Sequence, residues 1–225
     1  QIVAELDGYQ NIIQGAQQIV KNWKPTIDID PAWPKVKLDE VCEISPKKSE
    51  LKGVDEKTLV SFVPMSDLNQ NSSFFEPKQS KEISELIGSY TYFRENDVLL
   101  ARVTPCFENG KAGIARRLKN NKGFGSSEFI VIRPLDRVLP EVIYTYITDS
   151  KFSFEGRIKM TGTGGLKRVP IDFVANWFIS LPPLEIQQQI VEKIEAERTL
   201  VESAKKLIQI YKQKTKATIN KLWEE

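Results

Sequence analysis

The sequence predicts an α+β protein in which a globular domain of mixed strands is flanked by long helices that form an antiparallel coiled coil. Three observations predict this fold. Gln1-Ile2-Val3 recurs as Gln189-Ile190-Val191, and the apolar positions that follow each copy repeat in step. The second copy opens a long segment with the apolar spacing of a coiled coil. Between the copies lie short β-branched runs separated by glycine and proline. We therefore expect an N-terminal helix at 1–24, a globular domain at 32–182 and a long helix at 183–225.

The two terminal segments carry the apolar spacing of amphipathic helices. Residues 1–23 place apolar side chains near one helical face, although Tyr9 interrupts the stripe, and Lys24-Pro25 ends the pattern. Nothing after Pro183 breaks a helix of about 40 residues, which is roughly 60 Å long. Its predicted 4-3 seam comprises Ile190, Ile194, Glu197, Val201, Ala204, Ile208, Tyr211, Thr215, Thr218 and Leu222. The partner of this helix is the N-terminal helix of either the same chain or a second copy.

The region between the helices begins with an extended connector and continues in short patterns. Residues 26–34 contain two prolines and no periodicity, so they predict the connector. The segment 161–168 carries three glycines and predicts a flexible loop. The other patterns predict strands at 35–38, 58–64, 97–103, 112–118 and 128–134, and helices at 80–86 and 140–148.

Composition excludes several classes of function. The chain has no histidine, so serine-histidine and cysteine-histidine catalysis are excluded. Its only cysteines, Cys42 and Cys106, lie far apart, which disfavours a disulfide framework or a cysteine zinc site. No apolar run approaches the ~18 residues of a membrane span, and the first residues do not resemble a signal peptide. We therefore expect no membrane contact and a cytoplasmic location.

Basic residues gather in two segments of the domain. Residues 102–122 carry six Lys or Arg against Glu108 alone, and residues 151–168 carry five against Glu155 alone. Such clustering is typical of proteins that bind a polyanion such as DNA, whereas any single basic run is more often a solvated loop. The residues that we predict to contact DNA are Arg102, Lys111, Arg116, Lys167 and Arg168, with Asn109, Thr161 and Thr163 as further base or backbone contacts.

Two glycine-containing segments also have simpler interpretations. Asn109-Gly110 is a strong hairpin signal, which we favour, although a hairpin tip can also contact DNA. The glycine loop at 161–165 matches neither spacing of the nucleotide-binding motifs, so it does not predict a nucleotide site. Its glycines instead permit close approach of the backbone to a phosphate or a base edge.

One helix start carries a family resemblance. Leu181-Pro182-Pro183-Leu184 leads into Gln189-Ile190-Val191 and follows the glycine loop and Val169-Pro170-Ile171. This arrangement resembles the specificity subunits of type I restriction-modification systems. Gln1-Ile2-Val3 is similar to the same helix start without its Pro-Pro-Leu. Residues 33–38 and 97–102 are similar to the opening and middle of the recognition domains of that family.

The resemblance implies a non-catalytic module that reads double-stranded DNA. A full specificity subunit carries two recognition domains, each reading one half of a bipartite target, with the helices acting as a ruler between them. By the same resemblance, the helices dock a methyltransferase subunit, and a restriction subunit joins for cleavage. S-adenosylmethionine and magnesium are then expected only on those partner subunits, and this chain is expected to hold no cofactor.

The chain has one such domain between two helices, which implies half of the two-domain arrangement. We expect either a half-subunit that forms a homodimer through its helices or a fragment of a longer polypeptide, and the start at Gln1 favours the fragment. Two rival functions stay open. One is an assembly module whose coiled coil binds protein without DNA readout, and the other is a methyltransferase or nuclease domain, alone or fused. The bases recognised do not follow from the sequence.

Overall fold

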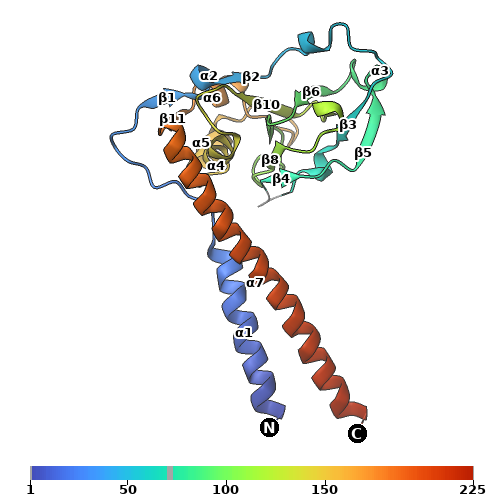
Figure 1. Cartoon of the computed structure of the whole chain (residues 1–225), viewed down its shortest axis with the longest axis vertical. Helices are drawn as coiled ribbons and strands as arrows, with labels where there is room; N and C mark the ends of the chain where they lie inside the picture. The colour runs from blue at the N-terminus through green and yellow to red at the C-terminus, as the bar shows by residue number, and fades with distance from the viewer. Residues whose placement is uncertain (1, 70–72, 225) are drawn as a thin grey trace. The chain divides into compact units, whose positions relative to one another are not determined.

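The computed structural model describes residues 2–69 and 73–224, with side chains described as far as residue 221 (Figure 1). It divides into two compact units. One consists of Gln1–Thr26 with Gln189–Glu225, and the other is Ile27–Gln188. The α+β class predicted from the sequence is confirmed, because long helices make up the first unit and mixed sheets with short helices make up the second.

The helical unit is a pair of antiparallel helices from the same chain. α1 (Ile2–Asn22) runs beside the part of α7 (Leu184–Glu224) that belongs to this unit (Figure 1). Near one end, the rings of Tyr9 and Tyr211 meet edge to face with centroids 5.3 Å apart. Near the other end, Trp23 Nε1 donates a hydrogen bond of 3.0 Å to Glu197 Oε2. Residue numbers rise in α1 as they fall in α7, so the two helices are antiparallel.

The predicted coiled-coil seam is the buried stripe of α7. Every predicted seam position from Ile190 to Thr218 is buried or half-buried, while the Leu222 side chain lies outside the described residues. The matching stripe of α1 consists of Leu6, Tyr9, Ile13, Ala16 and Val20, and it continues to Trp23 just beyond the helix. The expectation that Tyr9 interrupts this stripe was wrong, because its ring packs on Tyr211 within the seam.

The sequence repeat is also a repeat of burial. Ile13 and Val201, which correspond in the two copies, are both buried, as are Ala16 and Ala204. Val20 and Trp23 and their counterparts Ile208 and Tyr211 are half-buried. Two further corresponding pairs, Ile12 with Leu200 and Ile19 with Leu207, are exposed. Each copy therefore presents one apolar row to its partner helix and a second apolar row to solvent.

Three sheets form the framework of the globular unit. The strand orders are β1-β11, β2-β10-β7-β8-β4 and β5-β3-β9-β6, and every pair is antiparallel except β3 with β9 and β4 with β8. The strands are β1 (Lys35–Lys37), β2 (Cys42–Ile44), β3 (Leu59–Val63), β4 (Phe74–Phe75), β5 (Gln79–Glu82), β6 (Thr91–Arg94), β7 (Val98–Ala101), β8 (Ala112–Ala115), β9 (Lys122–Gly125), β10 (Phe129–Pro134) and β11 (Phe178–Ser180).

Short helices connect and cover these strands. They are α2 (Leu38–Val41), α3 (Ile83–Leu86), α4 (Pro140–Ile147), α5 (Ser150–Lys159) and α6 (Ile171–Ala175), with 3-10 turns η1 (Lys48–Leu51), η2 (Met65–Asp67) and η3 (Lys119–Asn121). The five predicted strands appear as β1, β3, β7, β8 and β10, and the predicted helix at 140–148 appears as α4. The helix predicted at 80–86 was wrong in its first half, because residues 80–82 pair with β3 and helix begins only at Ile83.

The four-stranded sheet has apolar side chains on both faces. Val63 and Phe93 on one face belong to a cluster with residues of the five-stranded sheet, including Leu99 and Val131. The opposite face carries the second cluster, which comprises Leu51, Val60, Phe62, Ile83, Leu86, Tyr92 and Phe124. Side chains alternate between the two faces of a strand. One face of the four-stranded sheet therefore shares a core with the five-stranded sheet, and α3 and η1 cover the opposite face.

An aromatic cluster anchors the loop between β7 and β8 to the helices. Phe107 of this loop lies 6.1 Å from Phe152 of α5, measured between ring centroids, and Phe152 lies 5.1 Å from Trp177 and 5.2 Å from Phe173. Phe152 is fully buried. Since such ring pairs contribute beyond their buried area, the cluster holds the β7–β8 loop against α5 and α6.

We expect the two cysteines to differ sharply in reactivity. Cys42 is buried, and this burial raises the pKa of its thiol to about 12, whereas Cys106 is half-buried. Because the thiolate is the nucleophile, maleimide at mildly alkaline pH should label Cys106 in the folded chain and leave Cys42 unmodified. Peptide mass spectrometry reads the label, and denatured chain, in which both react, is the control. Equal labelling of both cysteines in the folded chain would contradict this expectation.

Candidate nucleic-acid interface

Three loops of the globular unit meet beside the end of β7. They are residues 102–111 between β7 and β8, residues 126–128 between β9 and β10, and the glycine loop at 161–168. The Arg102 amide donates to the Glu128 carbonyl at 2.9 Å, and the Thr104 amide donates to the Lys167 carbonyl at 3.0 Å. Segments that are distant in the sequence therefore form one surface, which includes residues from both predicted basic segments.

The glycine loop is closed at its stem and exposed beyond it. The Arg168 amide donates to the Thr161 carbonyl at 2.8 Å, and the Thr161 amide returns a bond of 3.0 Å to the Arg168 carbonyl. On the other side, Thr104 Oγ1 donates to the Gly165 carbonyl at 2.8 Å. All residues from Thr161 to Lys167 are exposed. The stem is therefore held by strand-like pairing while the tip faces solvent.

Arg168 and Glu128 form an ion pair within this surface. Arg168 Nε lies 2.9 Å from Glu128 Oε2, and Arg168 Nη2 lies 2.5 Å from Oε1. The hydrogen bonds from Arg168 lower the pKa of the Glu128 carboxyl; burial opposes this shift, and the charges of Arg168 and Arg102 add to it. Since a lowered carboxyl pKa favours the charged form, the pair contributes stability above the ordinary pKa of a glutamate and loses it as pH falls.

The stability that this pair contributes is small. The side chains of Arg168 and Glu128 are 38% and 26% exposed, so water screens their attraction. Pairs of this exposure contribute little net stability. Glu128 was not among the residues predicted from the sequence, because that prediction looked only for basic and amide side chains. The feature that marks it is an acidic residue in a short turn between two strands.

The structure brings most of the predicted DNA contacts to this surface. Arg102 is half-buried, and its Nε is a buried donor without a hydrogen-bond acceptor among the described residues. Lys111 closes the β7–β8 loop and donates from Nζ to the Met65 carbonyl at 3.3 Å. Asn109 and Thr163 lie exposed in their loops. Asn109 belongs to a ten-residue turn and not to the short hairpin that Asn-Gly indicates. The roles of Asn109 and of the other predicted residues in DNA contact stay predictions.

Arg116 lies apart from this surface. It follows the end of β8, whereas Lys111 precedes the start of that strand. Arg116 Nη2 forms an ion pair of 2.6 Å with Glu141 of α4, and its guanidinium also lies over the Phe74 ring. Contact between Arg116 and DNA would require this pair to open, so our proposals below rest on the other residues.

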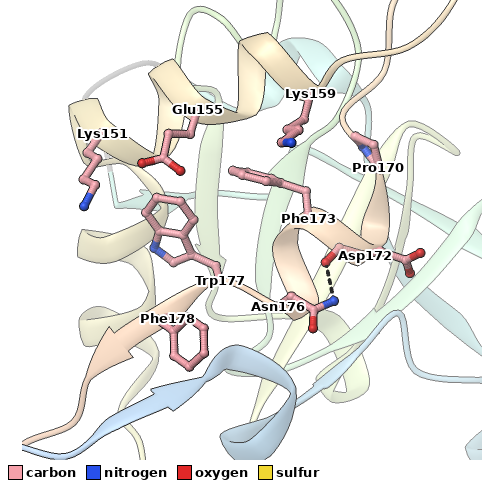
Figure 2. A pocket seen from close by; sticks show the side chains of 9 residues that line it. All are labelled: Lys151, Glu155, Lys159, Pro170, Asp172, Phe173, Asn176, Trp177 and Phe178. Carbon is pink, nitrogen blue, oxygen red and sulfur yellow. Dashed lines mark hydrogen bonds between the residues drawn. The ribbon is translucent and has the colours of Figure 1, made fainter.

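A pocket of about 550 Å³ lies near the stem of the glycine loop. Figure 2 shows Lys151, Glu155 and Lys159 of α5 on one side and Phe173, Trp177 and Phe178 on the other, with Pro170, Asp172 and Asn176 completing the lining. Basic and acidic side chains alternate around aromatic walls. No residue of the predicted DNA interface lines this pocket, and it lacks the single-sign charge of a polyanion site.

We expect Gly162→Ala to disrupt the glycine loop. Gly162 has φ +140°, and a Cβ there would lie 2.4 Å from the Leu166 carbonyl oxygen. The cost should be about 1–3 kcal/mol of unfolding free energy, measured by urea denaturation, together with weaker DNA binding. Gly164→Ala is the matched control, since φ is +63° there and the added Cβ meets open space. If the two variants were equally stable, the close contact at Gly162 would not matter.

The described part of the chain contains neither a membrane-spanning candidate nor a metal-binding cluster. No described helix is long and apolar enough to cross a bilayer. Within residues 2–69 and 73–224, no three Cys, Asp or Glu side chains come together in a group that could hold a metal ion.

The fold combines a globular unit of mixed sheets with a unit of two long antiparallel helices. The chain belongs to the family described as "Type I restriction modification DNA specificity domain", whose model matches residues 32–212. It is 34% identical over 175 residues to the type I restriction enzyme EcoEI specificity subunit of Escherichia coli, covering 77% of this chain and 29% of that protein. It is also 34% identical over 178 residues to the EcoAI specificity subunit of the same organism, with the same shares covered. The chain thus spans less than a third of the length of these curated relatives.

Solved structures of the same class share the fold. The HsdS subunit from Thermoanaerobacter tengcongensis aligns with a TM-score of 0.54 at 21% identity, over 98% of this chain and 52% of that one. A structure concerned with complex assembly and conformational transition of the type I R-M system aligns with a TM-score of 0.60 at 19% identity, over 98% of this chain and 57% of that one. The resemblance inferred from the Pro-Pro-Leu helix start is confirmed.

Proposed function

We propose that the chain reads one half of a bipartite DNA target as the specificity module of a type I restriction-modification system. The observation that carries this proposal is the loop surface beside β7, where Arg102, Lys111, Lys167 and Arg168 come together from segments far apart in the sequence. Family membership supports the same function. Lys167 and Arg102 supply charge for phosphates, while the exposed Asn109 and Thr163 supply donors and acceptors for base edges.

Binding of duplex DNA tests this proposal directly. The chain, together with its methyltransferase partner, is incubated with a pool of randomised duplexes, and bound molecules are sequenced. We expect enrichment of a short motif and an affinity that falls linearly on a log-log plot against salt. An affinity that is salt-dependent but lacks any enriched motif would reduce the function to non-specific binding. Absence of binding even at low salt would favour the rival interpretation as an assembly module.

We propose that the helical unit docks the methyltransferase subunit, and that the restriction subunit joins that assembly. The register set by Tyr9–Tyr211 and Trp23–Glu197 brings Ile12 level with Leu207 and Ile19 level with Leu200, on one side of the seam. These four side chains are 37% to 68% exposed. A row of exposed apolar side chains beside a helix pair is typical of a surface that binds further helices.

A paired substitution tests the docking surface. Leu200→Glu with Ile19→Glu should abolish co-purification of the methyltransferase subunit, while Glu202→Ala and Lys205→Ala, which remove an exposed ion pair from α7, should not. Sedimentation of the chain alone measures homodimerisation through the same row. If the variants lose self-association and still bind the methyltransferase, the row serves a second copy of the chain instead.

We further propose that the chain is non-catalytic, holds no cofactor itself and acts in the cytoplasm. S-adenosylmethionine and magnesium would then bind only to the partner subunits. The absence of histidine supports this, since it removes the commonest acid-base residue. Thermal unfolding of the isolated chain with either compound is the test, because a ligand that binds the folded state raises the midpoint. A midpoint raised by S-adenosylmethionine would instead favour a methyltransferase domain.

A further inference from the structure

The hydrogen bonds between Arg168 and Glu128 fix the orientation of the guanidinium as well as pairing the two charges. The carboxylate engages the side-on edge of the guanidinium, formed by Nε and Nη2. The opposite edge, formed by Nη1 and the second hydrogen of Nη2, makes no hydrogen bond to the described residues. An arginine held in this way presents two parallel donors in a fixed plane.

We propose that Arg168 reads a guanine in the major groove of the target half-site through this open edge, and that Glu128 is the positioning residue that fixes its orientation. The inference rests on the function proposed above and names the base that the surface reads. Two parallel N–H donors match the O6 and N7 acceptors of guanine, which no other base presents together. A phosphate can accept the same fork, but charge alone also gives a phosphate contact, so a carboxylate that orients the arginine is needed most where a base edge is read.

The backbone around Arg168 is suited to precise placement. Arg168 pairs with Thr161 on one side, and the next residue, Val169, donates its amide to the Arg102 carbonyl at 2.8 Å. Val169 is fully buried, so the chain is fixed immediately after the reading residue. A side chain that discriminates between bases must be held within a fraction of an ångström, and a buried neighbour with paired backbone provides this.

The positive charge of Arg102 offsets the repulsion between the Glu128 carboxylate and DNA. Its guanidinium charge acts on Glu128 without a hydrogen bond to it. Two arginines and one glutamate carry a net charge of about +1, so the group attracts DNA while the carboxylate still orients Arg168. Lys167, exposed beside it, is free of this restraint and suits a phosphate contact.

Base-by-base selection tests the proposal in the assembly with the methyltransferase subunit. Randomised duplexes are selected with the native protein and with Arg168→Ala, Arg168→Lys, Glu128→Gln and Glu128→Ala. We expect the native motif to contain a guanine whose preference falls about ten- to hundred-fold in Arg168→Ala, with the other positions unchanged. Arg168→Lys keeps the charge but loses the fork, so it should lose most of this preference.

The Glu128 variants separate positioning from folding. Glu128→Gln keeps the side-chain shape and should weaken the preference at the same guanine, while binding to random duplexes stays equal or rises because a negative charge is removed. Glu128→Ala should show a larger loss at that position only. A merely structural role would lower affinity for every sequence alike and would lower the thermal midpoint together with it.

A modified base in the DNA provides a test that does not depend on the Glu128 variants. Each guanine of the selected motif is replaced in turn by 7-deazaguanine, which lacks the N7 acceptor. We expect one position at which the replacement weakens binding by native protein and has no effect on Arg168→Ala. The proposal is wrong if the motif contains no such guanine, or if Arg168→Ala weakens all sequences equally, and the proposed function would survive either result. Absence of any enriched motif would instead contradict the proposed function itself.

Discussion

Asp97→Ala is expected to lower the unfolding free energy of the globular unit by about 3–5 kcal/mol. Asp97, which immediately precedes β7, and Arg133, in β10, are both almost fully buried. Arg133 Nε and Nη2 each lie 2.8 Å from an oxygen of Asp97. Burial is the largest single influence and lowers the pKa of Arg133, but the hydrogen bonds and charge of Asp97, together with the charges of Glu50 and Glu43, outweigh it, so this pKa is raised. Removal of Asp97 would leave a buried cation without its main partner.

The remaining acidic neighbours place the effect toward the lower end of that range. Glu50 also pairs with Arg133 and is 34% exposed, and Glu43 lies 3.8 Å from Arg133 Nη1. Urea denaturation measures the change as a lower midpoint with an unchanged slope. Arg117→Ala is the matched control, because Arg117 and Glu76 form a pair that is 85% and 81% exposed, and it should change stability by less than about 0.5 kcal/mol.

A double replacement tests whether the buried pair itself is favourable. In Asp97→Leu with Arg133→Met, both charges are removed together, so neither is left unpaired. Much of the loss seen in Asp97→Ala should be recovered, since replacing a buried pair by apolar side chains of similar size is often neutral. A loss in Asp97→Ala of less than about 1 kcal/mol would mean that water or Glu50 already compensates Arg133.

The second large effect is expected on DNA affinity, from Lys167→Ala combined with Arg168→Ala. Both residues lie at the stem of the glycine loop, beside Thr104 and Glu128. Loss of one phosphate contact and one base contact should weaken binding of the selected duplex roughly 10- to 1000-fold, and the salt dependence should become shallower by about one unit. Fluorescence anisotropy over a range of salt concentrations measures both quantities.

Lys52→Ala with Lys57→Ala is the control for charge. Both lysines are exposed and precede β3, whereas Met65, which bonds Lys111, follows that strand. The control removes the same charge about one strand length away, so it should change affinity by no more than a few-fold. If both double variants lost affinity equally, net charge would explain the result and the loop surface would not be the interface.

Elements whose pattern is local were predictable from the sequence. The coiled-coil seam depends on side chains spaced along one helix, so Ile194, Val201 and Ala204 could be identified as its buried positions. Strands with runs of β-branched residues or leucine, such as β7 and β10, were identified for the same reason. Tyr9 was misjudged because an aromatic residue counted as a break until its contact with Tyr211 was visible.

Elements that depend on distant partners could not be predicted. Residues 80–82 are polar and read as helix, yet β3 supplies their backbone hydrogen bonds. α5 was missed altogether, since its few apolar residues form no stripe and Phe152 alone anchors it in the aromatic cluster. Arg116 was assigned with the other basic residues because nothing near it in the sequence shows that Glu141 is its partner.

The sequence by itself determined the family, the two helices and the regions from which the proposed interface is drawn, because each of these rests on a local motif, a periodic spacing or a charge cluster. The tertiary structure decided which basic residues share a surface and which orientation they take. Arg168 was identified as basic from the chain alone, but its pairing with Glu128 and the direction of its open edge follow from a side-chain contact across 40 residues. Hydrogen bonds between such distant segments carry no signal in either segment, so the difference between a charge that attracts DNA and a side chain placed to read a base appears only in the folded chain.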